Sequence, residues 1–121
     1  MRRDWIGAAI ALFSIGAAGP AAAQNIGGSY TVRGTNFDGT AYTGTASITL
    51  TSNTTCRIVW QTGASASTGI CMRTHDSFAA AYVLGNKIGL VLYQIRPDGS
   101  LDGTWTIADE SGAGTEVLTP R

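Results

Sequence analysis

Two cysteines, Cys56 and Cys71, most constrain what this chain can fold into, because they are its only cysteines and flank a segment patterned like a hairpin. Residues 58–60 (Ile-Val-Trp) are β-branched or aromatic, which favours a pleated strand. Residues 63–66 (Gly-Ala-Ser-Ala) are small and suit a connecting loop. Folding the chain back at this loop places Cys56 opposite Cys71, at a Cβ separation close to what a disulfide requires.

The same arrangement pairs Ile58 with Gly69 and Trp60 with Ser67. Two free buried thiols are the alternative to a Cys56–Cys71 disulfide. Export favours the disulfide, because disulfides persist in oxidising compartments. Closing a loop of about 16 residues stabilises a fold by roughly 3 kcal/mol in the chain-entropy model.

The first 23 residues have the features of a cleavable signal peptide. Residues 1–3 (Met-Arg-Arg) are basic, residues 6–15 (IGAAIALFSI) are apolar, and residues 21–23 are the small alanines that a signal peptidase requires. The rival interpretation is a retained membrane anchor, for which the apolar run is too short. We expect cleavage after Ala23 and export to the periplasm or the medium, without membrane attachment afterwards.

The remaining segment, residues 24–121, predicts a single domain with a marginal core, for which a covalent cross-link is useful. It carries six basic and seven acidic side chains. This balance leaves no basic surface to hold a nucleic acid or an anionic membrane.

Short runs of alternating residues, separated by turn signals, predict eight strands and no helix. The clearest is Ala41–Leu50, where apolar or small residues alternate with threonine and serine. Besides the cystine hairpin, the other strands are expected at Ser29–Arg33, Phe78–Leu84, Ile88–Ile95, Leu101–Ala108 and Thr115–Thr119. The nearly all-apolar range Ile88–Ile95 is expected to be buried on both faces.

Every predicted connection is short, which excludes parallel crossovers and favours antiparallel neighbours in chain order. An open meander of eight strands would expose two edges, so we expect Thr115–Thr119 to pair with Ser29–Arg33. The predicted fold is all-β, a small eight-stranded antiparallel up-and-down (meander) β-barrel. Residues 38–40 (Asp-Gly-Thr) and 98–100 (Asp-Gly-Ser) begin similar segments, which a duplication or convergent turn chemistry explains equally well.

The alternation also predicts which side chains point into the barrel. An eight-stranded barrel is just wide enough to be filled by side chains or to hold one small ligand. The residues expected inside are Ile48, Leu50, Ile58, Trp60, Phe78, Tyr82, Leu90, Leu92, Leu101, Trp105, Ile107 and Val117. So many bulky groups predict a packed interior, with any binding left to the rim loops.

Chemistry-bearing clusters are scarce in this sequence. His75 and Asp76 form the one pair suited to acid–base work, with Ser77 beside them. Three polar residues in a row favour a turn over a catalytic site. One histidine and two paired cysteines do not suit a metal site. We therefore expect neither an enzyme nor a bound cofactor or metal.

Several motifs carry a resemblance that spans Gly28 to Pro120. They are GSYTVRGTNFDGTAYTGTASITL, CRIVWQTG, GICM, GLVLYQI, DGSLDGTWTI and GTEVLTP. This set resembles a group of small exported bacterial proteins, some of them labelled "fibronectin-binding protein". The strand pattern is also similar to avidin-like barrels and to small periplasmic protease or lysozyme inhibitors. The resemblance implies an exported β-domain and supplies no binding residues.

Two functions follow as hypotheses. The first is a non-enzymatic protein-binding module, adhesin-like or inhibitor-like, whose rim loops contact an extracellular or periplasmic protein. The candidate rim residues are Asn36, Phe37, Asp38, Arg73, His75, Asp76, Arg96 and Asp98. The alternative is a carrier of a small apolar ligand in the barrel interior.

Overall fold

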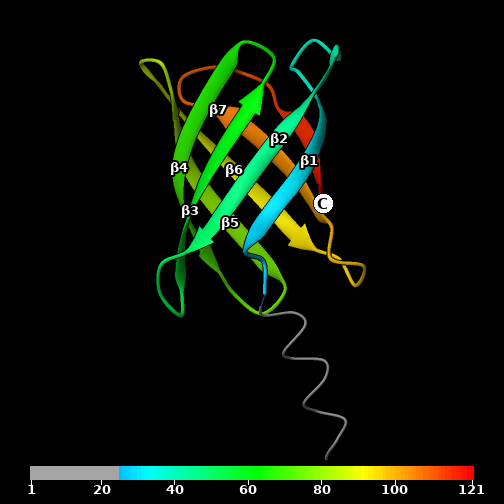
Figure 1. Cartoon of the computed structure of the whole chain (residues 1–121). Coiled ribbons are helices and arrows are strands. Elements are labelled where there is room, and N and C mark those ends of the chain that lie inside the picture. Colours follow the sequence, from blue (N-terminus) through cyan, green and yellow to red (C-terminus); the bar gives the residue numbers. More distant parts are fainter. Residues whose placement is uncertain (1–24) are drawn as a thin grey trace, which may run out of the picture.

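The chain forms a closed barrel of eight antiparallel strands that follow one another in chain order (Figure 1). This computed structural model describes residues 25–121, so the predicted signal peptide lies outside the described residues. The strands are β1 (Gly28–Thr35), β2 (Ala41–Leu50), β3 (Thr55–Thr62), β4 (Ser65–Arg73), β5 (Ser77–Leu84), β6 (Lys87–Ile95), β7 (Leu101–Ile107) and β8 (Gly114–Pro120). The predicted meander barrel is confirmed. Within residues 25–121, no helix is long and apolar enough to cross a membrane.

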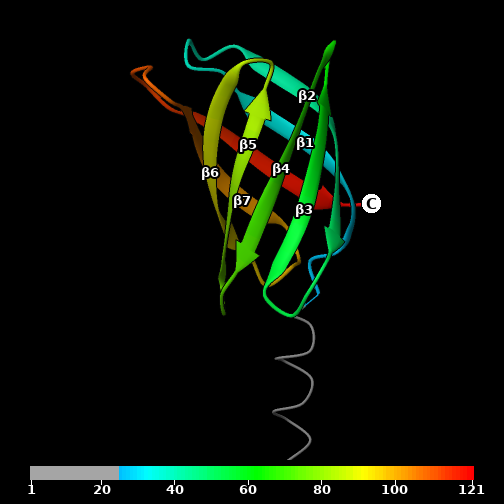
Figure 2. The same cartoon turned by 90° about the vertical axis from the view of Figure 1, so that its left-hand side faces the viewer.

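Pairing between β1 and β8 closes the barrel, as expected from the cost of open edges. The antiparallel register sets Thr31 opposite Thr119 and Thr35 opposite Thr115. In Figure 2 the last strand lies beside the first, at the back of the view. The backbone N–H of Arg121 donates to the carbonyl oxygen of Ser29 at 3.0 Å. The start of β1 and the end of β8 are therefore neighbours.

The cystine hairpin is formed by β3 and β4 with the predicted register. Cys56 lies opposite Cys71, and Trp60 lies opposite Ser67. The two cysteines form a disulfide and are almost fully buried. The turn between the strands has Gly63 at φ 63°, a left-handed backbone that glycine adopts without steric cost.

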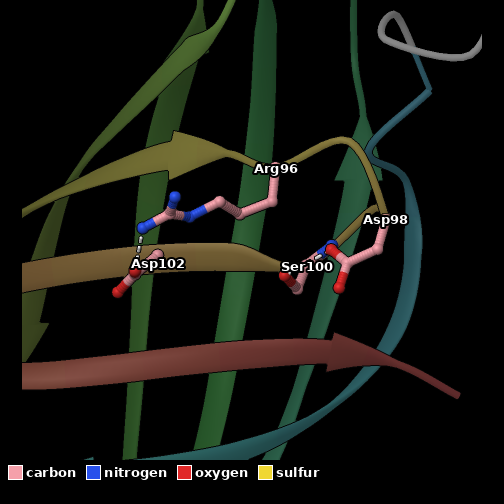
Figure 3. Close-up of polar contacts among 4 residues, drawn as sticks. All are labelled: Arg96, Asp98, Ser100 and Asp102. Carbon is pink, nitrogen blue, oxygen red and sulfur yellow. Dashed lines mark hydrogen bonds and ion pairs between the residues drawn. The ribbon is translucent and has the colours of Figure 1, made fainter.

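The two similar Asp-Gly segments form the same turn on different hairpins. Gly39 has φ 88° and Gly99 has φ 89°. In the first turn, the Asp38 carboxylate accepts hydrogen bonds from the backbone N–H and hydroxyl of Thr40. In the second, Asp98 accepts the same pair from Ser100, next to the Arg96–Asp102 ion pair (Figure 3). Local turn chemistry is therefore sufficient to explain the repeat.

One end of the barrel is closed by packed side chains. We call it the closed end; it carries the β2–β3, β4–β5 and β6–β7 connections. Ile26 covers it, and its carbonyl oxygen accepts a hydrogen bond of 2.6 Å from the Tyr30 hydroxyl. The buried cluster that includes Ile26 also contains the two bonded cysteines and the stacked rings of Phe78 and Tyr93, whose centroids are 5.1 Å apart.

The inward face was predicted correctly for some strands and wrongly for others. Ile48, Ile58, Trp60, Phe78, Tyr82, Leu101 and Ile107 are buried as expected. Leu90 and Leu92 of β6, 59% and 62% exposed, instead face solvent, and so does Val117 of β8. Their neighbours Val91, Tyr93 and Leu118 point inward. Strand β6 is therefore buried on one face and not on both.

Leu50 was also expected inside, and it is 45% exposed. It has the same parity as buried Ile48, but it is the last residue of β2. Alternation predicts on which face of a strand a residue lies, and it does not predict how exposed a residue is at the end of the strand.

Candidate functional site

The other end of the barrel holds an open cavity of about 310 Å³. We call this the open end; it carries the β1–β2, β3–β4, β5–β6 and β7–β8 connections. The cavity is lined by aromatic, aliphatic, small polar and acidic side chains: Tyr42, Trp60, Tyr82, Trp105, Leu84, Val91, Ile107, Asn36, Thr62, Ser65, Ser67 and Glu116. The predicted packed interior is thus correct for the closed end and wrong for the open end.

Glu116 of β8 is the chemically distinctive residue of this cavity. It is 6% exposed and is the only buried charged or polar residue among residues 25–121. Its Oε1 accepts a hydrogen bond of 2.7 Å from the Tyr42 hydroxyl. Its Oε2 accepts one of 3.0 Å from the Trp60 indole N–H and a short one from the Tyr93 hydroxyl. Three different strands therefore direct donors at one carboxylate.

These donors explain how the barrel accommodates a carboxylate in its interior. Burying a charge without partners is strongly unfavourable. Hydrogen bonds to an ionised acceptor are roughly twice as strong as neutral ones and offset part of that cost. Within the described part of the chain, the ion pairs are Lys87–Glu110 and Arg96–Asp102, and neither involves Glu116.

Burial and the charge of Glu116 act together on the nearby tyrosines. Desolvation, followed by the Glu116 charge, raises the pKa of Tyr82 to about 12. The same two causes, in the same order, raise the pKa values of Tyr42 and Tyr93, and each of these hydroxyls also bonds to Glu116. The phenols therefore remain protonated at neutral pH and act as hydrogen-bond donors.

Glycines on the neighbouring strands make room for the cavity aromatics. Tyr82 lies opposite Gly89, where an added Cβ would be 2.1 Å from the tyrosine ring. Trp105 lies opposite Gly114, where a Cβ would be 2.2 Å from the indole. Each ring therefore lies across the adjacent strand in a space that only glycine leaves free.

The aromatic rings also contact one another around the cavity. Trp60 and Tyr82 meet edge to face, with ring centroids 5.2 Å apart. Phe37, from the β1–β2 loop, stacks on Trp105 at 4.9 Å. Tyr42 meets Trp105 edge to face, with ring centroids 6.3 Å apart. Such pairs add to the stabilisation from buried area and hold the rings in defined orientations.

The candidate rim residues do not form one surface. Asn36, Phe37 and Asp38 lie at the open end, where Asn36 lines the cavity. The other five residues lie at the closed end, at the end of β4 and on the β4–β5 and β6–β7 connections: Arg73, His75, Asp76, Arg96 and Asp98. The barrel therefore separates the two groups by its full length.

Several closed-end candidates already have partners within the protein. Arg96 pairs with Asp102, as drawn in Figure 3. Arg73 donates to the Asn53 carbonyl oxygen at 3.4 Å, and Asp76 accepts from the Ser77 hydroxyl at 3.3 Å. These contacts give the residues a role in shaping turns. Within residues 25–121, no cluster of three metal-ligating side chains occurs.

Sequence reasoning did not identify Glu116, Tyr42 or Tyr93 as site residues. The predicted strand Thr115–Thr119 has apolar residues on both faces, since Val117 and Leu118 are adjacent. Choosing Val117 as the inward residue turned Glu116 toward solvent. A signal was available in the tyrosines and the many strand glycines, but only the strand register pairs Tyr42, Tyr82 and Tyr93 each with a glycine on the neighbouring strand.

No protein-family model matches this chain, and no curated protein matches it. Solved structures do match. A redesigned β-barrel is 20% identical with a TM-score of 0.73, covering 84% of this chain and 96% of the other. The redesigned β-barrel mFAP1, bound to DFHBI, is 24% identical with a TM-score of 0.70, covering 81% and 97%. A de novo designed fluorescence-activating β-barrel is 19% identical with a TM-score of 0.65, covering 83% and 97%. These likenesses show the fold, a small eight-stranded barrel.

Proposed function

We propose that this protein binds a small molecule in the open end of its barrel. The observation that carries the proposal is the buried carboxylate of Glu116, which lines an open cavity among aromatic side chains. Ligand sites are typically concave and mostly apolar, with a few precisely placed polar groups. The cavity has this composition, and its volume is at the small end of the usual range.

The fold is compatible with this role. Barrels of eight strands can hold one small ligand when their side chains do not fill the interior. Here the closed end is filled and the open end is not. One similar structure is described as bound to DFHBI, which supports ligand binding by this architecture. The proposal modifies the carrier hypothesis, because Glu116 suits a ligand with a polar group better than a purely apolar one.

Protein binding through the rim loops remains a prediction. The candidate residues lie at opposite ends of the barrel, so one partner would contact only one group of them. Export to an oxidising compartment also remains a proposal, which the Cys56–Cys71 disulfide supports. The absence of enzymatic activity remains an expectation.

The test of small-molecule binding is an NMR titration with aromatic amines, alcohols and acids of one or two rings. The indole N–H signals of Trp60 and Trp105 report on the cavity directly, because both side chains line it. We expect a saturable shift of both signals with at least one compound. A shift confined to residues of the outer face, such as Leu90 and Leu92, would contradict binding in the cavity.

Two variants of adjacent residues on β4 provide a matched control. Ser67 lines the cavity and Thr68 faces solvent. Ser67→Leu should fill the cavity and abolish binding, whereas Thr68→Leu should leave the affinity unchanged. Thermal unfolding of both variants verifies that they are folded. Equal effects of the two substitutions would argue against a site inside the barrel.

A further inference from the structure

The charge lining the cavity is all of one sign. Among residues 25–121, Glu116 is the only carboxylic acid on the cavity wall, and no lysine, arginine or histidine lines it. The three groups that bond to the carboxylate, from Tyr42, Trp60 and Tyr93, are neutral donors. They reduce the cost of burying the carboxylate and supply no positive charge to neutralise it. A ligand carrying a positive charge would complement this charge, and an anion would be repelled.

The carboxylate has room for one more donor. A carboxylate offers about four acceptor positions, two on each oxygen. Within the described part of the chain, Oε2 accepts from Trp60 and Tyr93, whereas Oε1 accepts only from Tyr42. The position left over belongs to Oε1, on a side chain that lines the cavity. An ammonium N–H is a donor suited to that position.

The walls around the carboxylate are suited to the same kind of group. Trp60, Tyr82, Trp105 and Tyr42 all line the cavity. Electron-rich ring faces attract cations, and the effect grows when the cation is removed from water. The Tyr82 hydroxyl is already used, since it donates to the Thr106 carbonyl oxygen at 3.2 Å. Tyr82 therefore offers the ligand mainly its ring.

The geometry points to a small organic cation, an amine or methylated ammonium on a compact body, as the ligand, with its nitrogen against Glu116 Oε1 and its body between the aromatic rings. This inference rests on the proposed small-molecule function and specifies the ligand class. Neutral aromatic compounds would use the rings alone. Anions would be excluded.

The experiment compares three compounds of the same shape on the oxidised protein at neutral pH. They are benzylammonium, benzyl alcohol and benzoate, and binding is measured by calorimetry and by the indole N–H shifts of Trp60 and Trp105. Benzylammonium should bind at least about tenfold more tightly than benzyl alcohol, the amount expected from one hydrogen bond to a charged group. Benzoate should not bind.

Two glutamates at the open end provide the matched variants. Glu116→Gln should reduce the affinity for benzylammonium to that for benzyl alcohol. Glu110→Gln changes an exposed glutamate paired with Lys87 on the rim and should leave the preference intact. If both variants lose the preference equally, the cation is attracted by the overall field of the rim, and the assignment to Glu116 is wrong.

A third variant keeps the inference testable if Glu116→Gln does not fold. Tyr42→Phe removes the hydroxyl that donates to Oε1, so the affinity should rise more for benzylammonium than for benzyl alcohol. A weaker preference for the cation in Tyr42→Phe would overturn the inference.

If benzyl alcohol binds the parent protein as tightly as benzylammonium, the ligand class is wrong and small-molecule binding stands. If no compound of this series or of the wider panel shifts the indole signals, both proposals fail.

Discussion

Glu116 connects most of the unusual residues of this barrel. Its carboxylate holds the hydroxyls of Tyr42 and Tyr93 and the indole of Trp60 in place. Its charge also makes the ionisation of nearby phenols unfavourable. Three of the four tyrosines, at positions 42, 82 and 93, respond to Glu116 in this way. Burial alone raises the pKa of the fourth, Tyr30.

We therefore expect no tyrosine of the folded protein to ionise with the ordinary pKa near 10. A phenol whose pKa is raised by folding contributes stability that is complete below about pH 10 and is lost as the pH rises toward the folded-state pKa. Phenolate absorbance should appear only at higher pH, as the protein unfolds. The same titration in denaturant serves as the control and should give the ordinary value. A tyrosine that titrates near pH 10 in the folded state would contradict this.

The β3–β4 hairpin is the element in which local pattern and tertiary structure agree most closely. Its register was expected from the spacing of Cys56 and Cys71, and the two residues are paired and bonded. The disulfide lies inside the barrel at the closed end, among the packed residues. It therefore stabilises the half of the barrel that has no cavity.

Reducing the disulfide should lower the free energy of unfolding by roughly 3 kcal/mol, because the unfolded chain regains the freedom of a loop of this length. The cysteines are 15 positions apart. Chemical denaturation with and without reductant measures the change. The double variant Cys56→Ser/Cys71→Ser is the control and should be insensitive to reductant. Equal unfolding midpoints for oxidised and reduced protein would show that the disulfide contributes nothing.

Substitutions in strand β8 test directly which of its two faces points into the barrel. Leu118 is fully buried, whereas Val117 beside it is 38% exposed. Leu118→Ala should cost about 2–5 kcal/mol of stability, as core truncations do, and Val117→Ala should cost less than about 1 kcal/mol. Urea unfolding of the two variants gives the comparison. A larger cost at Val117 would restore the original prediction and turn Glu116 toward solvent.

For the whole molecule, barrel closure brings the first and last strands together. β1 pairs with β8 along most of its length, and Arg121 bonds to Ser29. No edge strand is left unpaired in the described barrel. The start of β1 and the end of β8 meet at the closed end of the barrel, away from the cavity. The chain could therefore be joined at that point without changing the site at the open end.

A circular permutant should consequently fold to the same barrel. Linking residue 121 to residue 25 and opening the chain between His75 and Asp76 leaves every strand intact. The expected result is an amide NMR spectrum that matches the parent away from the new junctions, with unchanged cavity signals. Opening the chain between Leu90 and Val91, inside β6, is the control and should prevent folding. A permutant opened at residues 75–76 that does not fold would show that this connection is needed for more than joining β4 to β5.

The strand order, the barrel closure and the register of the β3–β4 hairpin could all be predicted from the sequence. These follow from short-range information: turn residues such as Asp38-Gly39, connections too short for a crossover, and cysteines at opposed positions. The cost of two open edges then leaves a closed barrel as the consistent arrangement. None of these inferences requires knowing which side chains touch across the interior.

The sequence did not predict which faces of β6 and β8 point inward, and the inward face of β8 carries Glu116 of the site. Both strands carry apolar residues on both faces, so alternation cannot distinguish Leu92 from Tyr93. The cross-strand register distinguishes them, because Tyr93 lies opposite Gly103, where a Cβ would be 2.5 Å from its ring. The same register turns Glu116 inward to meet the Tyr93 hydroxyl. The cavity remains because the inward side chains of all eight strands together fill one end of the barrel and leave the other open.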